Sequence, residues 1–216
     1  MTRPVLYVLA GVNGAGKSSI GGHLLERNGL TSFNPDTFAR DLKAATGCAQ
    51  EMANAHAWQE SMRRLDEAMA KGLNYAFETT LGGKTVAARI LKATKMHDVL
   101  IWFCGLSSPE LHIARVKARV AAGGHPIPVE KIRERYPLAQ LNLIRLMAHA
   151  AYIKVYDNST EAAPDATVPD PRLVLEMENG RVIYPDEKNL NALQLVPEWA
   201  KSILEAALQN ENRPNK

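Results

Sequence analysis

Residues 11–18 constrain the fold of this chain more than any other segment. They read Gly-Val-Asn-Gly-Ala-Gly-Lys-Ser and match the pattern G-x-x-x-x-G-K-[ST] at every fixed position. The β-prone run Val5–Ala10 precedes them, and a helix is expected to follow from Lys17 to about Arg27. In this strand–loop–helix context the motif predicts a loop whose backbone N–H groups bind phosphate.

The rest of the chain alternates strand-like and helix-like segments. Further strands are expected at 75–78, 98–105 and 151–156. Helices are expected at 36–45, 56–71, 85–95, 109–122, 129–149 and 197–208, and the glycines at 123–124 end the fourth of them. Pro137 is expected to kink or break the helix at 129–149. Asn179-Gly180 predicts a hairpin between 173–177 and 182–184. The pattern predicts an α/β, three-layer P-loop NTPase/kinase fold, with a parallel sheet flanked by helices.

The length of 216 residues favours a single domain, placed at 1–208, followed by a polar tail at 209–216. Hydrophobic residues make up 46% and charged residues 23%, which argues against a disordered chain or a coiled coil. The apolar run near the start is too short to span a membrane.

Cys48 and Cys104 form no Cys-x-x-Cys pair, so a cytoplasmic location without disulfides is expected. The net charge of +3 does not by itself indicate nucleic acid or membrane.

The glycine-rich loop is expected to hold the phosphates of ATP or GTP. Lys17 would place a positive charge near the transferred phosphate, and the Ser18 hydroxyl would ligate Mg²⁺. The expected nucleotide-binding residues are Gly11, Asn13, Gly14, Ala15, Gly16, Lys17, Ser18 and Ser19.

Other motifs narrow the class of nucleotide protein. The chain has no Asp-x-x-Gly switch and no Asn-Lys-x-Asp guanine-binding motif, which argues against a GTPase. The strand at 98–105 ends Trp-Phe-Cys-Gly, without the acids of many ATPases. The candidate acids are instead Asp36 and Glu78, an arrangement that suits a kinase with a base to orient an acceptor hydroxyl.

Asp36 follows the turn at 32–36, where an acceptor could meet the γ-phosphate, although it could also be an N-cap. Asn34, Glu78, Thr79 and Thr80 are candidate acceptor contacts. The last three end a strand at the carboxyl edge of the sheet, but they could equally be an ordinary polar junction.

Basic residues gather in the segment 115–136, which contains six Lys or Arg and two Glu. Two basic helices joined by Gly123-Gly124 predict a lid that brings guanidinium groups onto the phosphates. Arg119, Arg133 and Arg135 are the candidates, and periodicity alone does not choose among them; a solvated helix face explains about half of the basic residues equally well. His125 could touch a phosphate or cap a turn.

Taken in order, the motifs resemble the zeta toxin family of P-loop kinases, in a compact form. The resemblance covers 5–159 and rests on the phosphate loop, Asn34-Pro35-Asp36, the segment 77–81 (Phe-Glu-Thr-Thr-Leu), the lid residues and Asp157-Asn158-Ser159. It implies a kinase that uses ATP or GTP to phosphorylate a hydroxyl of UDP-N-acetylglucosamine.

Carried over, the resemblance implies Asp36 as the base, Lys17 and Ser18 as phosphate and Mg²⁺ ligands, and Glu78 and Thr80 as acceptor contacts. It places the segment 157–159 near the nucleotide base and suggests an antitoxin protein as a partner. The chain lacks an extended sugar-nucleotide insertion, so another metabolite or an antibiotic remains an alternative acceptor. A regulatory module that binds nucleotide without transferring phosphate is a second alternative; nucleic acid and membrane are not expected partners.

Overall fold

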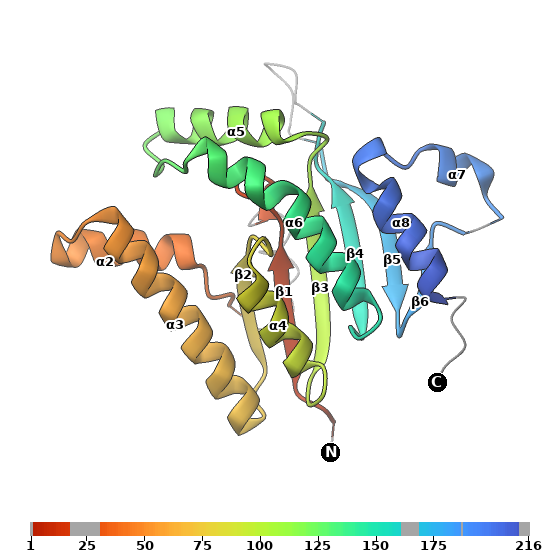
Figure 1. The fold of residues 1–216 in the computed structure, drawn as a ribbon, viewed down its shortest axis with the longest axis horizontal. Coiled ribbons are helices and arrows are strands. Elements are labelled where there is room, and N and C mark those ends of the chain that lie inside the picture. Colours follow the sequence, from red (N-terminus) through yellow and green to blue (C-terminus); the bar gives the residue numbers. More distant parts are fainter. Residues whose placement is uncertain (1, 18–30, 161–168, 187, 212–216) are drawn as a thin grey trace.

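A computed structural model describes residues 2–17, 31–160, 169–186 and 188–211 (Figure 1). The helix predicted after Lys17, the residues Ser18 and Ser19, and most of the polar tail lie outside these ranges. Six strands form one sheet in the order β2-β1-β3-β4-β5-β6. They are β1 (Val5–Ala10), β2 (Tyr75–Thr79), β3 (Asp98–Gly105), β4 (Tyr152–Asp157), β5 (Arg172–Glu178) and β6 (Arg181–Tyr184).

The predicted parallel sheet is confirmed for β2, β1, β3 and β4, which pair in parallel. The predicted hairpin also forms, with Asn179 and Gly180 at positive φ in its turn. Its strand β5 pairs antiparallel with β4, so the hairpin extends the same sheet and makes it mixed. Because the four parallel strands point the same way, the loops after β1 and β2 meet at one edge.

The helices agree with the predicted pattern except at three places. They are α2 (Pro35–Thr46), α3 (Gln50–Lys71), α4 (Lys84–Ala93), α5 (Pro109–Ala121), α6 (Val129–Met147), α7 (Leu190–Gln194) and α8 (Glu198–Glu211). Helix α3 begins six residues earlier than predicted, because Ala53 and Ala57 are buried with Ala39 of α2. Helix α6 continues through Pro137 without a break, and the short α7 was not predicted.

The main core lies between one face of the sheet and the helices α3, α4, α6 and α8, of which the last three lie in front of the strands in Figure 1. Alternate residues of β1 (Leu6, Val8, Ala10) face this core. The other face carries a smaller cluster in which Tyr7 stacks on Trp102, with ring centroids 5.5 Å apart. This burial fixes β1, and with it the loop that follows.

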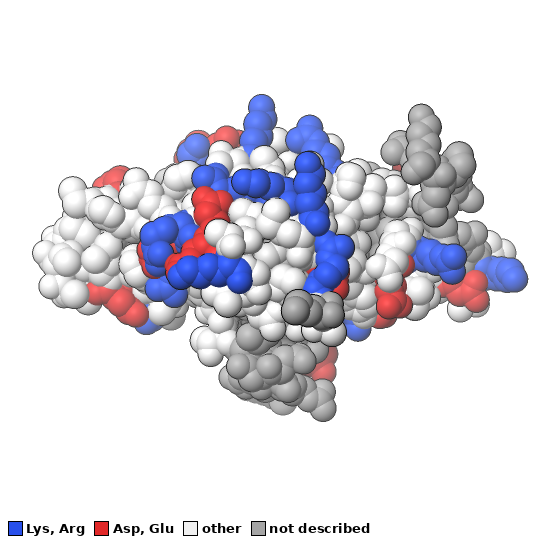
Figure 2. All heavy atoms as spheres, turned by 90° about the horizontal axis from the view of Figure 1, so that it is seen from below, with Lys and Arg blue, Asp and Glu red and all other residues white. Residues whose placement is uncertain are grey.

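Charged side chains are scattered over the end of the molecule at which β1 begins. Figure 2 shows this end, with Lys and Arg near its middle and Asp and Glu beside them. Helix α3 carries exposed ion pairs of this kind, including Arg63 with Glu67 and Lys71 with Glu67. Exposed pairs like these add little stability. Within the described residues, no helix is both long and apolar enough to cross a membrane.

Candidate active site

The glycine-rich loop leaves β1 at Gly11, whose backbone conformation and surroundings require glycine. Its φ is 143°, and a Cβ atom there would lie 2.3 Å from the Cys104 carbonyl oxygen of β3. Its N–H donates to the Thr79 carbonyl at the end of β2, at 3.2 Å. The loop is therefore held against both strands that neighbour β1, with little room to shift.

Lys17 is the last residue of the loop that the structure describes. Its Nζ donates to the Gly11 carbonyl oxygen at 2.9 Å, so the ammonium lies over the loop. Asn158, the residue after β4, contacts the loop, because its Nδ2 donates to the Ala15 carbonyl oxygen at 2.9 Å. Asp157 accepts hydrogen bonds from Trp199 and Ser159, and the place of 157–159 near the nucleotide base stays a prediction. The predicted loop residues Ser18 and Ser19 fall outside the described residues.

His112 of α5 contacts the phosphate loop, and this contact was not predicted from the sequence. It is 1% exposed, and its Nδ1 lies 2.9 Å from the Asn13 carbonyl oxygen. Burial lowers the pKa of His112 to about 4. The ring is therefore neutral near pH 7, and Nδ1 carries the proton that it donates to the carbonyl.

The buried His112 predicts a loss of stability in acid. In the unfolded chain His112 binds a proton at its ordinary pKa near 6.5, but in the folded chain only near 4. The contribution of this neutral imidazole to the free energy of unfolding is therefore fully present above pH 6.5 and is lost as the pH drops towards 4. Between pH 7.5 and 5 this site should lower the free energy of unfolding by about 2 kcal/mol. Urea unfolding of wild type and His112→Asn at both values tests this; an equal drop in the variant would exclude His112 as the cause.

Asp36 lies in the first turn of α2, and the N-cap is its neighbour Asn34. The Asn34 Oδ1 accepts from the N–H groups of Asp36 and Thr37, at 2.9 and 3.2 Å. Phe33 pairs with Phe77 in a parallel bridge, so the chain enters α2 directly beside β2. The N-cap alternative for Asp36 is therefore wrong, and its carboxylate is left to face the site.

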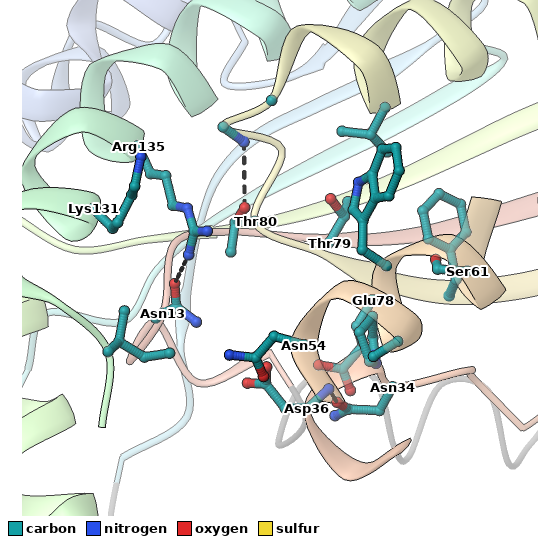
Figure 3. Close-up of a pocket in the computed structure, with 18 of the residues that line it drawn as sticks. Asn13, Asn34, Asp36, Asn54, Ser61, Glu78, Thr79, Thr80, Lys131 and Arg135 are labelled. Atoms are coloured by element: carbon teal, nitrogen blue, oxygen red, sulfur yellow. Dashed lines mark hydrogen bonds between the residues drawn. The ribbon is translucent and has the colours of Figure 1, made fainter. Parts of the chain in front are cut away.

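The residues after β2 lie on the same side. Glu78 is only 8% exposed. The hydroxyl oxygens of Thr79 and Thr80 accept from the N–H groups of Leu81 and Gly82, at 3.0 and 3.5 Å. Figure 3 shows Glu78 close to Asp36 and Asn34. The turn and the strand end that the sequence predicted as acceptor contacts are therefore brought together.

Two cavities meet at these residues. The smaller has a volume of about 390 Å³ and lies between α3, the end of β2 and α6. The larger, about 1040 Å³, lies between the phosphate loop, α2 and the α5–α6 connection. Both are lined by Asn13, Lys17, Asn34, Asp36, Glu78 and His125. The shared wall thus contains the loop lysine and the candidate base.

The three candidate lid arginines take different positions. Arg135 donates from Nη1 to the Asn13 Oδ1 at 2.9 Å and lines the smaller cavity (Figure 3). Arg119 lines the larger cavity, with Nη1 3.9 Å from the Asp36 Oδ2. Arg133 pairs with Glu110 on the surface and lines neither cavity, so the structure does not bring it to the site.

Charge concentrates around Asp36. The His125 Nε2 lies 3.7 Å from its Oδ1, on the other oxygen from Arg119. Burial lowers the pKa of the Arg135 guanidinium below its ordinary value, and the nearby Asp36 carboxylate opposes that shift. Arginine nevertheless stays charged in proteins. The carboxylate therefore faces two arginines and an imidazole.

Sequence reasoning missed one wall of the smaller cavity. Asn54, Trp58 and Ser61 of α3 line it, together with Lys131 and Glu134 of α6. The sequence does indicate a longer buried face on α3, because the apolar stripe at 62, 65 and 69 continues towards the N-terminus through Ala57 and Ala53. Extending that stripe would have placed Asn54 and Trp58 at the edge of a buried helix face.

The loop motif predicts that backbone N–H groups bind the phosphates of a triphosphate, and Lys17 lines the shared wall. The described residues contain no group of three or more His, Cys, Asp or Glu that could hold a metal ion. The Ser18 hydroxyl, which the motif predicts as a Mg²⁺ ligand, lies outside the described residues.

A mixed α/β sheet with this loop after its first strand defines a P-loop, kinase-like nucleotide-binding fold. The chain belongs to the AAA_33 family, described as an AAA domain, whose model matches residues 6–139. An uncharacterised protein of Haemophilus influenzae is 26% identical over 151 residues, which cover 63% of this chain and 100% of that protein.

Two solved structures share the fold. The AvrRxo1-ORF1:ORF2 complex with ATP aligns with a TM-score of 0.66 and 15% identity, over 91% of this chain. This chain spans 64% of that one, less than two thirds of its length. The PezAT chromosomal toxin–antitoxin system of Streptococcus pneumoniae aligns with a TM-score of 0.56 and 16% identity, over 98% of this chain and 87% of that one.

Proposed function

We propose that the chain is a small-molecule kinase that transfers the γ-phosphoryl group of ATP or GTP to a hydroxyl group. The observation that carries the proposal is the shared wall between the two cavities, which contains both Lys17 and Asp36. The nucleotide would occupy the larger cavity and the acceptor the smaller one. A protein that only senses nucleotide has no need of a second cavity that opens on the same carboxylate.

The proposed reaction is direct transfer between the two molecules. Asp36 accepts the proton of the acceptor hydroxyl, and the hydroxyl oxygen forms a bond to the γ-phosphorus. The bond from the γ-phosphorus to the β–γ bridging oxygen breaks, and ADP (or GDP) leaves with that oxygen. Mg²⁺, when bound, would offset negative charge on the phosphate oxygens.

The basic side chains would stabilise the transferring group. Lys17, whose ammonium donates to the Gly11 carbonyl oxygen, would exchange that contact for a phosphate oxygen. Arg135 and Arg119 would turn from Asn13 and Asp36 towards the phosphoryl oxygens as charge spreads over them. This exchange would also release Asp36 from Arg119 to receive the proton.

Gly82 permits the position of Arg135 in this account. A Cβ atom at Gly82 would lie 2.6 Å from the Arg135 Cγ and 3.2 Å from its Cα. Gly82→Ala should push Arg135 away from Asn13 and lower kcat by about 10²-fold. Gly83→Ala is the matched control, because its nearest contact would be Val86 at 3.9 Å. Steady-state kinetics of both variants tests this prediction, and equal kcat values in Gly82→Ala and Gly83→Ala would contradict it.

The finer part of the proposal concerns acceptor and partner. The resemblance to zeta toxins makes UDP-N-acetylglucosamine the first acceptor to test. The similar PezAT and AvrRxo1 structures are of systems or complexes with a second protein, so an antitoxin-like partner is proposed as well. Co-purification of the product of an adjacent gene with the tagged chain would support the partner.

Phosphoryl transfer itself is tested with purified protein. ATP, Mg²⁺ and each of a panel of acceptors that includes UDP-N-acetylglucosamine are incubated with the protein, and products are examined by mass spectrometry. The proposal predicts a new phosphomonoester and an equal amount of ADP. Nucleotide binding without transfer to any member of a broad hydroxyl-bearing panel would favour the regulatory alternative.

A further inference from the structure

One wall of the smaller cavity is suited to recognising the acceptor. Asn54, Trp58 and Ser61 are spaced four and three residues apart, so they lie on one face of α3. None of them lines the larger cavity, and none belongs to the phosphate loop or the lid. This α3 wall therefore contributes to the smaller cavity without taking part in phosphate binding.

Trp58 is unusual for its exposure. It is 50% exposed, whereas Trp102 and Trp199 are 7% and 8% exposed. Apolar side chains lie in the same lining, among them Met62 and Val86. An indole in such surroundings offers a flat apolar surface on which another ring can stack. The α3 wall therefore favours an acceptor with a ring.

The charges in the smaller cavity balance. Its described lining contains three cations, Lys17, Lys131 and Arg135, and three carboxylates, Asp36, Glu78 and Glu134. Lys131 pairs with Glu134 at 2.9 Å, and Arg135 contacts Asn13. The larger cavity instead collects Arg40, Lys43, Arg115 and Arg119. In the proposed reaction Lys17 and Arg135 bind the transferring phosphoryl group, and Lys131 is paired with Glu134, so the described lining offers no further cation to an acceptor with its own phosphates.

The size of the smaller cavity sets a second limit. Its volume of about 390 Å³ is near the lower end of the range of about 300–1,000 Å³ for small-molecule sites. That volume suits a molecule of one or two rings. Hydroxyl and amide groups of Ser61, Asn54, Thr79 and Thr80 line it and can bind ring hydroxyls.

On the basis of the proposed kinase function, we propose that the acceptor is an uncharged, hydroxyl-bearing ring compound. Its ring would stack on Trp58, its other hydroxyls would contact Asn54 and Ser61, and one hydroxyl would face Asp36. Nucleosides and monosaccharides share this chemistry. A nucleoside diphosphate sugar does not, so this acceptor class departs from the one that the zeta toxin resemblance implies.

Calorimetric titration of the full chain with uridine, N-acetylglucosamine and UDP-N-acetylglucosamine tests the proposal. An uncharged compound should bind, and the one that binds distinguishes a nucleoside from a sugar. Trp58→Ala should raise its Kd and KM about tenfold with little change in kcat, and Trp58→Phe should recover most of the loss. Met52→Ala is the control, because Met52 is exposed on the same helix and lines neither cavity.

Three results would overturn the proposal: binding of UDP-N-acetylglucosamine alone, binding of none of the three compounds, or an unchanged Kd in Trp58→Ala. Binding of a fluorescent ATP analogue, measured in every variant, separates this proposal from the kinase function. If wild type binds a ring compound through Trp58 but never transfers phosphate, the kinase function fails and the ring site stands. If ATP binding also survives in Trp58→Ala, misfolding does not explain its loss of acceptor binding.

Discussion

Asp36→Asn is expected to lower kcat for phosphoryl transfer by about 10²–10⁴-fold while nucleotide binding stays close to that of the wild type. The amide keeps the shape of the side chain in the wall shared by the two cavities, but it cannot accept the hydroxyl proton. The loss should therefore appear in kcat rather than in the KM for ATP. Single-turnover transfer, measured beside binding of a fluorescent ATP analogue, separates the two effects.

A matched control lies on the same helix. Asp41 is exposed, pairs with Arg40 and lines neither cavity. Asp41→Asn removes the same charge from α2 and should leave kcat within about twofold, because an exposed ion pair of this kind contributes little. Full activity in Asp36→Asn would remove the base from the account and leave a nucleotide-binding module.

Arg135→Ala is expected to lower kcat by about 10³-fold, the effect typical of an arginine that stabilises a transferring phosphoryl group. The guanidinium is partly buried and contacts Asn13 in the phosphate loop, so it lies beside the loop before it turns to the phosphoryl group. Arg135→Lys should recover only part of the rate, because lysine lacks the planar fork that contacts two oxygens. Both variants are measured by steady-state kinetics.

Arg133 provides the comparison, since it lies two residues away on the same helix. It pairs with Glu110 on the surface, and Arg133→Ala should change kcat less than twofold, as expected of an exposed ion pair. Equal losses in Arg133→Ala and Arg135→Ala would contradict the choice of Arg135 over Arg133 as the arginine that stabilises the phosphoryl group.

The choice between these two arginines shows how far sequence reasoning reaches. Residues two apart on a helix point in directions about 200° apart, so only one of them can face the cleft. Arg135 follows the buried Ile132 by three residues and precedes the buried Ala139 by four, which places it on the core side. The sequence alone shows that the segment 115–136 is basic. The choice of Arg135 over Arg133 depends on which residues of α6 are buried.

Local signals predicted most of the fold. The strand β3 has the predicted ends, and the Asn-Gly turn forms the hairpin. Where prediction failed, the cause was tertiary. The start of α3 depends on contact with α2, and the pairing of β5 with β4 joins segments that local patterns do not connect. The helix face that carries Trp58 could have been found by extending the apolar stripe of α3 backwards, but its place beside the site depends on packing and was not predicted.

A structure of the complex with a non-hydrolysable ATP analogue and Mg²⁺ would show whether the phosphate loop and Asp36 meet at the γ-phosphate. The proposed mechanism predicts that the γ-phosphate lies at the wall shared by the two cavities. Lys17 should have left the Gly11 carbonyl for a phosphate oxygen, and Asp36 should face the γ-phosphorus across a gap that admits a hydroxyl. A triphosphate bound away from the loop, or an Asp36 carboxylate turned from the smaller cavity, would contradict it.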